Sequence, residues 1–292
     1  MEKYCIAVLT RGYDDISGYN DLIKRNVAIY ENLKNYDIDI LIFHEGNILD
    51  AHQEYIINKT SQLKIKFIDI KKDNIAFKEE KKDIPLQIRV NWPLGYRHMC
   101  SFWFIDFWNF VKGYDYLLRI DEDCFINFNI DDLFKLMDTY YFVYGHYEDD
   151  KKYVTVGLND FTLNFLKNEN KDKIYESKNS AGPYTNVFLL NIRELQKNEL
   201  LMKYIKEVEL SNKIYSHRWG DLPLWGEVIH YLFDNSLAIL IDIKYYHGSH
   251  NKNINSENII DTTKKQTTID PDCFDAFLQN RLRNLNRSRL RN

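Results

Sequence analysis

Glycine is scarce in this chain, and it contains none of the glycine-rich sequence motifs that bind nucleotides. The 292 residues include only 11 glycines. Neither a Walker loop nor a G-x-G-x-x-G fingerprint occurs, and no G-x-S-x-G nucleophile elbow is present. The sequence therefore excludes phosphate binding by a glycine-rich cradle and the serine chemistry of α/β-hydrolases.

The chain also has few cysteines, no net positive charge and no long apolar run. The four cysteines show neither zinc-site nor redox-motif spacing, and a net charge of −4 gives no general attraction to nucleic acid. No signal peptide precedes the first strand-like stretch, and no uncharged apolar run reaches the ~18 residues of a membrane span. From this sequence we therefore expect a soluble, cytoplasmic protein with no nucleic-acid partner and no transmembrane segment.

Apolar patterns alternate between strand and helix periods along most of the chain. Strands are predicted at 4–10, 38–43, 64–70, 114–120, 140–147, 184–192 and 237–243. Helices are predicted at 20–33, 52–61, 97–111, 129–137, 159–166, 200–210 and 224–233. This alternation predicts an α/β fold with a mostly parallel central sheet and helices on both faces. We expect a single domain over residues 1–251, followed by a C-terminal extension, 252–292, with a basic tail.

The segment YDYLLRIDEDCF, residues 114–125, carries the strongest chemical signal. Its first half has the composition of a buried strand, and Asp121, Glu122 and Asp123 follow directly. In an extended segment Asp121 and Asp123 point to one side and Glu122 to the other. Two carboxylates at the carboxyl end of a strand suit a hard divalent cation and the phosphates it carries. The alternative is a strand that runs into a solvated acidic loop.

Polar residues at other predicted strand ends and turns offer further candidates. Asp221, in the turn HRWGDLP, is either catalytic or the cap of the following helix. His247 follows the last strand and is either a ligand for a manganese-like metal or a hydrogen-bonded structural residue. Arg97 and Arg11 could hold a nucleotide diphosphate, although Arg97 could instead pair with Asp106.

A carboxylate metal site without a glycine-rich cradle fits an enzyme that acts on nucleotide sugars. In such an enzyme the metal ion stabilises the negative charge that develops on the departing diphosphate. The aromatic content of 15% suits a sugar-binding cleft as well as a hydrophobic core.

Four segments resemble, in order and at similar spacing, signature segments of the fungal α-1,2-mannosyltransferases that extend O- and N-linked mannans. They are Tyr96-Arg97-His98-Met99-Cys100, Tyr114-Asp115-Tyr116 through Arg119-Ile120-Asp121-Glu122-Asp123, Arg218-Trp219-Gly220-Asp221-Leu222-Pro223 and Tyr245-Tyr246-His247. Each is weak alone, but the ordered set is specific and covers roughly residues 4–251. The resemblance implies a GT-A (nucleotide-diphospho-sugar transferase) fold, a GDP-mannose donor, a glycan or glycoconjugate acceptor, a manganese ion and retention of anomeric configuration.

The resemblance also implies roles for individual residues. It places Asp121 and Asp123 at the metal–diphosphate site, with Asp123 and His247 as ligands of Mn²⁺ or another divalent cation. The candidate donor-binding residues are Tyr96, Arg97, Arg11, Asp121 and Arg119. Asp221 falls in the sugar pocket, and Asp221 and Asn186 are the candidate catalytic residues.

The sequence departs from this family in three respects. Thr185-Asn186-Val187-Phe188 corresponds to a Ser-Asn-aromatic-Glu segment, so Phe188 stands where the family has its proposed nucleophile. Departure and attack could then share one face of the sugar, another acid (Asp221 or Glu227) could substitute, or activity could be lost. Glu122 replaces the family's proline, which makes the segment more like the Asp-x-Asp of other GT-A enzymes. No membrane anchor precedes the domain, so a Golgi location would require that the sequence is a fragment of an anchored protein.

The leading prediction is a retaining, metal-dependent glycosyltransferase that moves mannose from GDP-mannose to a glycan hydroxyl, in protein glycosylation or glycan biosynthesis. The alternatives are a GT-A transferase that uses another nucleotide-sugar such as a UDP-hexose, a catalytically inactive glycan- or nucleotide-binding module, and a structural protein with a decayed transferase fold.

Overall fold

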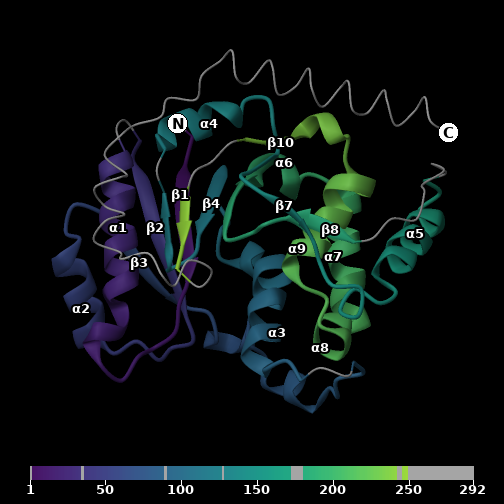
Figure 1. The fold of residues 1–292 in the computed structure, drawn as a ribbon, viewed down its shortest axis with the longest axis horizontal. Coiled ribbons are helices and arrows are strands. Elements are labelled where there is room, and N and C mark those ends of the chain that lie inside the picture. Colours follow the sequence, from purple (N-terminus) through teal and green to yellow (C-terminus); the bar gives the residue numbers. More distant parts are fainter. Residues whose placement is uncertain are drawn as a thin grey trace.

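A seven-stranded sheet forms the centre of the molecule. The computed structural model describes residues 2–33, 36–88, 91–126, 128–171, 180–241 and 245–248. The strand order is β10-β6-β9-β4-β1-β2-β3, and Figure 1 shows the sheet between helices on its two sides. The strands are β1 (Tyr4–Leu9), β2 (Ile38–His44), β3 (Lys64–Asp69), β4 (Tyr116–Ile120), β6 (Phe142–Tyr144), β9 (Val187–Asn191) and β10 (Ala238–Leu240). Only β9 runs antiparallel to its neighbours, β4 and β6, so the predicted mostly parallel α/β fold is confirmed.

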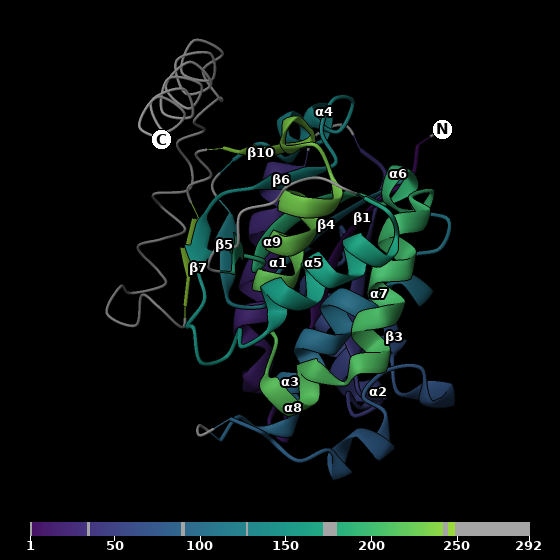
Figure 2. The same ribbon diagram turned by 90° about the vertical axis from the view of Figure 1, so that its right-hand side faces the viewer.

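Helices cover both faces of the sheet, because its central strands are apolar on both sides. One layer contains α1 (Asn20–Asn32), α2 (Asp50–Lys59) and α4 (Ile130–Leu136). The other contains α3 (Leu94–Ser101), α5 (Leu158–Asn168), α7 (Glu199–Ser211) and α9 (Asp221–Glu227), with the short α6 (Ile192–Gln196) and α8 (Lys213–His217). Figure 2 shows this second layer towards the viewer. Among the described residues, no helix combines the length and the apolar character that crossing a bilayer requires.

The predicted helix over residues 97–111 is helical as far as Asn109, but it is α-helical only to Ser101. A π-helical turn, Phe102–Asp106, and a 3-10 turn, Phe107–Asn109, follow α3. The wider turn changes the direction of the side chains that follow it. Trp103 within this turn stacks on the guanidinium of Arg119 at 4.4 Å from the ring centroid, so the irregular geometry contributes directly to the site described below.

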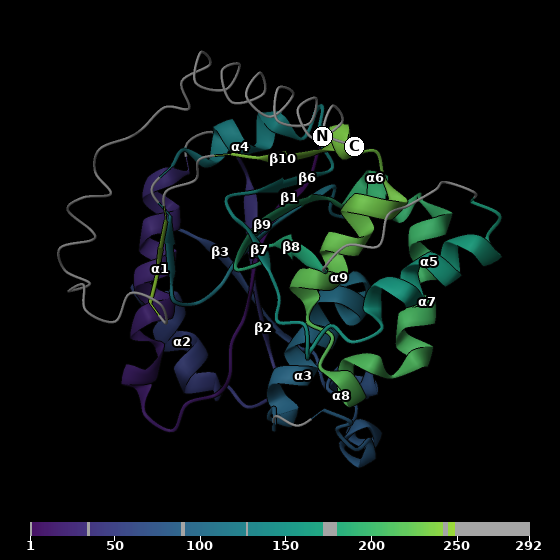
Figure 3. The same cartoon turned by 45° about the vertical axis from the view of Figure 1, so that its right-hand side comes forward.

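Two small antiparallel sheets were missed by the sequence prediction. One joins β5 (Cys124–Ile126) to β11 (Tyr245–His247), and the other joins β7 (Tyr147–Asp149) to β8 (Ala181–Pro183). Strands of three residues are too short for a reliable period. The predicted strand 140–147 divides into β6 and β7, and the predicted strand 184–192 begins only at Val187. Figure 3 shows β5 and the yellow-green β11 beside α1.

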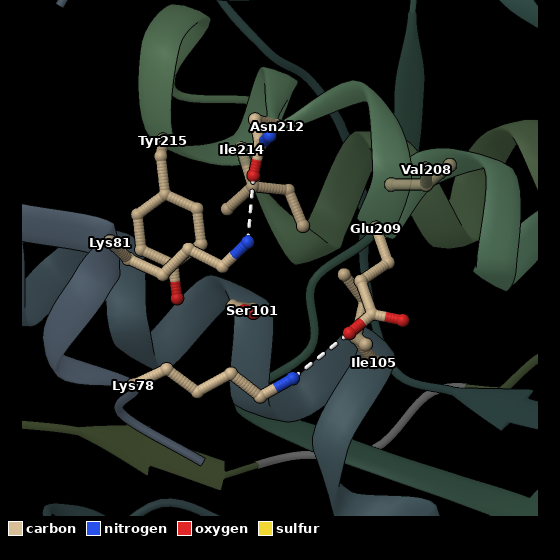
Figure 4. A pocket seen from close by; sticks show the side chains of 9 residues that line it. All are labelled: Lys78, Lys81, Ser101, Ile105, Val208, Glu209, Asn212, Ile214 and Tyr215. Atoms are coloured by element: carbon tan, nitrogen blue, oxygen red, sulfur yellow. Dashed lines mark hydrogen bonds and ion pairs between the residues drawn. The ribbon is translucent and has the colours of Figure 1, made fainter. Parts of the chain in front are cut away.

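Two lysines of the charged segment after β3, residues 71–83, contact α7 and the residue that follows it in the second helix layer. Lys78 Nζ lies 2.9 Å from Glu209 of α7, and Lys81 Nζ donates to Asn212 Oδ1 at 2.7 Å (Figure 4). Asp106 lies beneath them, 3% exposed and 3.7 Å from Lys78 Nζ. The predicted C-terminal extension, residues 252–292, lies outside the described residues, and the domain boundary at residue 251 stays a prediction.

Candidate active site

An open cleft of about 350 Å³ lies at the carboxyl ends of β1 and β4. Side chains from the loop after β1, from α3 and its π-helical turn, and from the end of β4 line it. They include Tyr13, Met99, Trp103, Arg119, Asp121, Glu122 and Asp123. Ligand sites of open α/β sheets occur at this edge.

The three acids after β4 lie in a turn, so the prediction of an extended segment is wrong. The Cys124 N–H donates to the Asp121 carbonyl at 3.1 Å, and the Asp121 N–H donates to the Asn186 carbonyl at 2.9 Å. The turn gives each carboxylate a different partner. Asp121 contacts Arg119, Glu122 contacts the loop after β1, and Asp123 faces His247.

Arg119 holds Asp121 and Asp221 together. Its Nε and Nη2 donate to Asp121 at 2.8 and 3.1 Å, and its Nη1 donates to Asp221 Oδ2 at 2.6 Å. Thr185 Oγ1 donates to the same Asp221 oxygen at 2.7 Å. Burial opposes the charged guanidinium, but the two carboxylates raise the pKa of Arg119 above its usual value. Arg119 thus holds Asp121, which lines the cleft, beside the buried Asp221.

The alternative that Asp221 caps a helix is wrong. Asp221 is the first residue of α9, Gly220 is the N-cap, and no side chain caps this end. The Asp221 side chain is buried and turned towards Arg119 and Thr185. The turn that contains Asp221 therefore directs its carboxylate to Arg119 near the end of β4, and its catalytic role stays a prediction.

Arg25 of α1 is a second buried cation behind the acids, and the sequence prediction missed it. Its Nε donates to the Ile120 carbonyl at 3.1 Å and its Nη2 to the Ala7 carbonyl at 3.3 Å. Burial lowers the pKa of Arg25 to about 9, and Asp121 and Glu122 act in the opposite direction. The sequence contained one signal for this role: an arginine on the apolar face of a predicted helix indicates a buried charge, and a buried charge requires polar or charged partners.

Glu122 fastens the loop after β1 to the acidic turn. Its carboxylate accepts hydrogen bonds from Thr10 Oγ1 and from Tyr13 Oη, the latter at 2.7 Å. Burial and the nearby Glu122 raise the pKa of Tyr13 to about 12, so its hydroxyl stays protonated at neutral pH. Arg11 lies at the rim of this loop, exposed, with its guanidinium 5.0 Å from the Tyr13 ring.

Asp123 and His247 meet although they are far apart in the sequence. His247 Nε2 lies 3.5 Å from Asp123 Oδ1, and the Gly248 N–H donates to the Asp123 carbonyl at 2.9 Å. Tyr184 Oη lies 3.4 Å from His247 Nδ1 and orients the ring. An imidazole and a carboxylate at this separation, both partly open to solvent, form a donor set that fits a divalent cation.

Asn186 links β5 and β11, the two strands that carry Cys124 and His247. Its Nδ2 donates to Cys124 Sγ at 3.5 Å, and its Oδ1 accepts from Tyr245 Oη at 2.8 Å. Asn186 is 5% exposed. This candidate catalytic residue therefore contacts the immediate sequence neighbours of Asp123 and His247.

Tyr96 belongs to a partly buried cluster around the buried Arg218. The Arg218 guanidinium stacks on Trp92 and Tyr96, at 4.3 and 4.9 Å from the ring centroids. Its Nη2 donates to Tyr96 Oη at 2.6 Å and its Nη1 to Asp150 at 2.5 Å. Arg218 has a left-handed backbone with φ of 59°, a conformation that is rare for a residue with a side chain. This cluster fixes the turn that precedes Asp221.

Arg97 is directed away from the acids of the cleft. It is 8% exposed, and its Nη1 donates to the Tyr215 carbonyl at 2.8 Å. The alternative ion pair with Asp106 is wrong, because Asp106 accepts from Ser101 at 3.2 Å and lies near Lys78.

Neither Phe188 nor Glu227 offers a nucleophile to the cleft. Phe188 lies on β9 opposite Arg119, packed between Phe142 and Trp225. Glu227 is 3% exposed and accepts hydrogen bonds from Ser180 at 3.0 Å and Asn159 at 3.3 Å. Burial raises the pKa of Glu227, consistent with a structural acid.

The sheet order, the cleft at the strand ends and the acidic turn after β4 define the GT-A fold of nucleotide-sugar glycosyltransferases. Among solved structures, the mannosyltransferase Ktr4p from S. cerevisiae matches with a TM-score of 0.71 and 18% identity, over 84% of this chain and 70% of that chain. Core-mannan synthase A from Aspergillus fumigatus, solved in a Mn/GDP form, matches with a TM-score of 0.67 and 14% identity, over 85% and 75%. The galactosyltransferase LgtC matches with a TM-score of 0.50 and 12% identity, over 92% and 98%. No model of a protein family matches the chain, and no curated protein sequence matches it. The resemblance to fungal mannosyltransferases is thus confirmed at the level of the fold.

Proposed function

We propose that this chain is a metal-dependent glycosyltransferase that moves mannose, with retention of configuration, from GDP-mannose to a hydroxyl of a glycan or glycoconjugate. The single observation that carries the proposal is the meeting of Asp123 and His247 at 3.5 Å beside the cleft. The fold supports it, because one structural neighbour is a mannosyltransferase and another, a core-mannan synthase, was solved in a Mn/GDP form. The transferase domain would occupy residues 1–251.

Asp123 and His247 would hold Mn²⁺ or another divalent cation. When bound, such a cation supplies positive charge against the diphosphate that leaves the sugar. Tyr13 and Arg11 lie on the loop after β1, where they could contact the nucleotide. Trp103, Met99 and Leu9 form the apolar part of the cleft wall.

Asp221 would bind the transferred sugar. Both hydrogen bonds that it accepts from described side chains end on Oδ2, so Oδ1 can accept from a sugar hydroxyl. Its charge is neutralised by Arg119, which makes its carboxylate a weak nucleophile. With Phe188 in the core, the proposed route to retention is departure and attack on one face of the sugar.

The test is donor hydrolysis in the absence of an acceptor. Protein incubated with GDP-mannose and Mn²⁺ should release GDP slowly, and release should stop on addition of EDTA. Asp123→Ala should lose the metal-dependent thermal shift by GDP, whereas Asp138→Ala, an exposed acid after α4, should keep it. Failure to release nucleotide from GDP-mannose or from any UDP-hexose would contradict the proposal.

The same experiment separates the alternatives. A larger thermal shift with UDP than with GDP would favour a UDP-hexose donor. Metal-dependent GDP binding without turnover would favour the inactive binding module, for which the position of Phe188 in the core is the specific observation.

A further inference from the structure

A third potential ligand, Cys124, lies beside Asp123 and His247. We propose that the Cys124 thiolate completes a three-ligand cation site, which therefore prefers thiophilic cations such as Zn²⁺ and Co²⁺ over Mg²⁺ and Mn²⁺. The inference rests on the proposed function, because it concerns the metal preference of the same site. It adds a residue that the Asp-x-Asp pattern does not contain and that the sequence resemblance did not assign.

The strand pairing places Cys124 and His247 on one face. In the antiparallel pair β5–β11, His247 is directly opposite Cys124. Side chains of directly opposed residues project from the same face of a sheet, with their Cβ atoms roughly 5 Å apart. The approach of thiol and imidazole thus follows from the register of backbone hydrogen bonds.

The distances between the ligand atoms are close to those of a four-coordinate metal site. Asp123 Oδ1 lies 3.5 Å from His247 Nε2 and 4.0 Å from Cys124 Sγ, and one ligand atom from each residue lies within 4.8 Å of the others. In a tetrahedral zinc site with bonds of about 2.0–2.3 Å, ligand atoms lie roughly 3.3–3.8 Å apart. The oxygen–nitrogen pair meets this spacing already, and the sulfur requires a shift of at most roughly 1 Å.

Neighbouring residues hold the thiol in place. Cys124 is fully buried, and Asn186 Nδ2 donates to its sulfur at 3.5 Å. Tyr245 in turn donates to Asn186 Oδ1 at 2.8 Å. Asp123 and His247 are more exposed, with side chains 26% and 15% accessible. The thiol therefore forms the floor of the site, and the side open to the cleft is left for a water molecule or a diphosphate oxygen.

Ligand chemistry decides the preference. Mg²⁺ and Mn²⁺ favour oxygen donors, whereas a sulfur–imidazole–carboxylate set favours Zn²⁺ and Co²⁺. Three protein ligands with one open position is the arrangement of catalytic zinc sites. When the metal–sulfur bond forms, the thiol proton passes to solvent, so that the charge balances.

The test is the absorption spectrum of the Co²⁺-loaded protein. The background carries Cys273→Ala, because Cys273 lies outside the described residues and could bind metal. We expect a near-ultraviolet sulfur-to-cobalt charge-transfer band together with the intense visible bands of a four-coordinate ion. Cys124→Ala should remove the near-ultraviolet band and weaken Zn²⁺ binding roughly 10- to 100-fold. Cys5→Ala, a buried thiol in the core, should change neither.

A second measurement does not depend on the variant folding. Zinc-edge X-ray absorption of the Zn²⁺-loaded protein with an intact Cys124 should show one sulfur neighbour at about 2.3 Å. Absence of that sulfur, or a charge-transfer band that persists in Cys124→Ala, would overturn the inference. GDP release is assayed in parallel with Mn²⁺, Co²⁺ and Zn²⁺. Release without the sulfur signal refutes only the thiolate ligand, and a sulfur signal without release by any of the three cations refutes only the proposed function.

Discussion

Replacing Arg119 with methionine removes the cation between Asp121, which lines the cleft, and the buried Asp221, while keeping an unbranched side chain. Arg119 makes two bonds to Asp121, at 2.8 and 3.1 Å, and one to Asp221, at 2.6 Å. The side chains of Arg119 and Asp221 are each 6% exposed, and that of Asp121 is 29% exposed. The substitution therefore leaves the Asp221 carboxylate buried with Thr185 as its remaining side-chain donor among the described residues.

The expected cost is large because a buried charge loses its counter-ion. Breaking a buried ion pair by removing one partner costs about 3–5 kcal/mol, and the more exposed Asp121 pair adds less. With a urea m-value of about 3 kcal/mol per molar, a loss of about 4 kcal/mol lowers the unfolding midpoint by about 1.3 M. Adding Asp221→Asn to Arg119→Met should recover part of this loss, with a coupling free energy between the two substitutions of about 1–3 kcal/mol.

Urea unfolding followed by tryptophan fluorescence measures these differences. Arg193→Met is the matched control, because Arg193 pairs with Glu2 at 3.2 Å while its side chain is 38% exposed. Its loss should cost less than about 1 kcal/mol. Equal midpoints for Arg119→Met and Arg193→Met, or no recovery in Arg119→Met/Asp221→Asn, would refute the view that Arg119 neutralises a buried acid.

Three further predictions concern stability. Burial raises the pKa of Asp106 from 3.8 to about 7, so its contribution to stability is full below about pH 4 and is lost as the pH rises through about 7. Asp106→Asn should therefore flatten the pH dependence of the unfolding free energy by up to about 4 kcal/mol, and an unchanged dependence would show that Asp106 ionises normally. Gly226→Ala would place a Cβ atom 1.7 Å from the Ala181 carbonyl oxygen. Because β8 must then move, we expect a loss of at least about 3 kcal/mol in urea unfolding, and a neutral effect would contradict the close approach of α9 to β8. Phe188→Ala should cost about 3–5 kcal/mol through the cavity it leaves, and a cost below about 1 kcal/mol would mean that Phe188 is not part of the packed core.

Much of the fold could be predicted because strands and helices each have a characteristic spacing of apolar residues along the sequence. The strands β1, β2 and β4 have continuous apolar sequences, since a central strand of a parallel sheet is buried on both faces. The acids after Ile120 could be placed at a strand end for the same reason. Predicted helix ends agree with the structure within a few residues where apolar residues are regularly spaced, as in α1. The change from α-helix to π-helix after Ser101 could not be predicted, because the aromatic residues that follow are apolar on every side of the helix.

The sequence by itself determined the strand–helix alternation, the acids at the end of β4 and the ordered segments that resemble mannosyltransferases. Only the tertiary structure decided which partner each acid has. It assigned Arg119 to Asp121 and Asp221, placed Arg25 behind the acidic turn, and brought Cys124 and His247 into one register. The physical reason is that apolar periodicity reports which face of an element is buried, whereas a contact between distant polar groups depends on strand register and on packing over the whole domain.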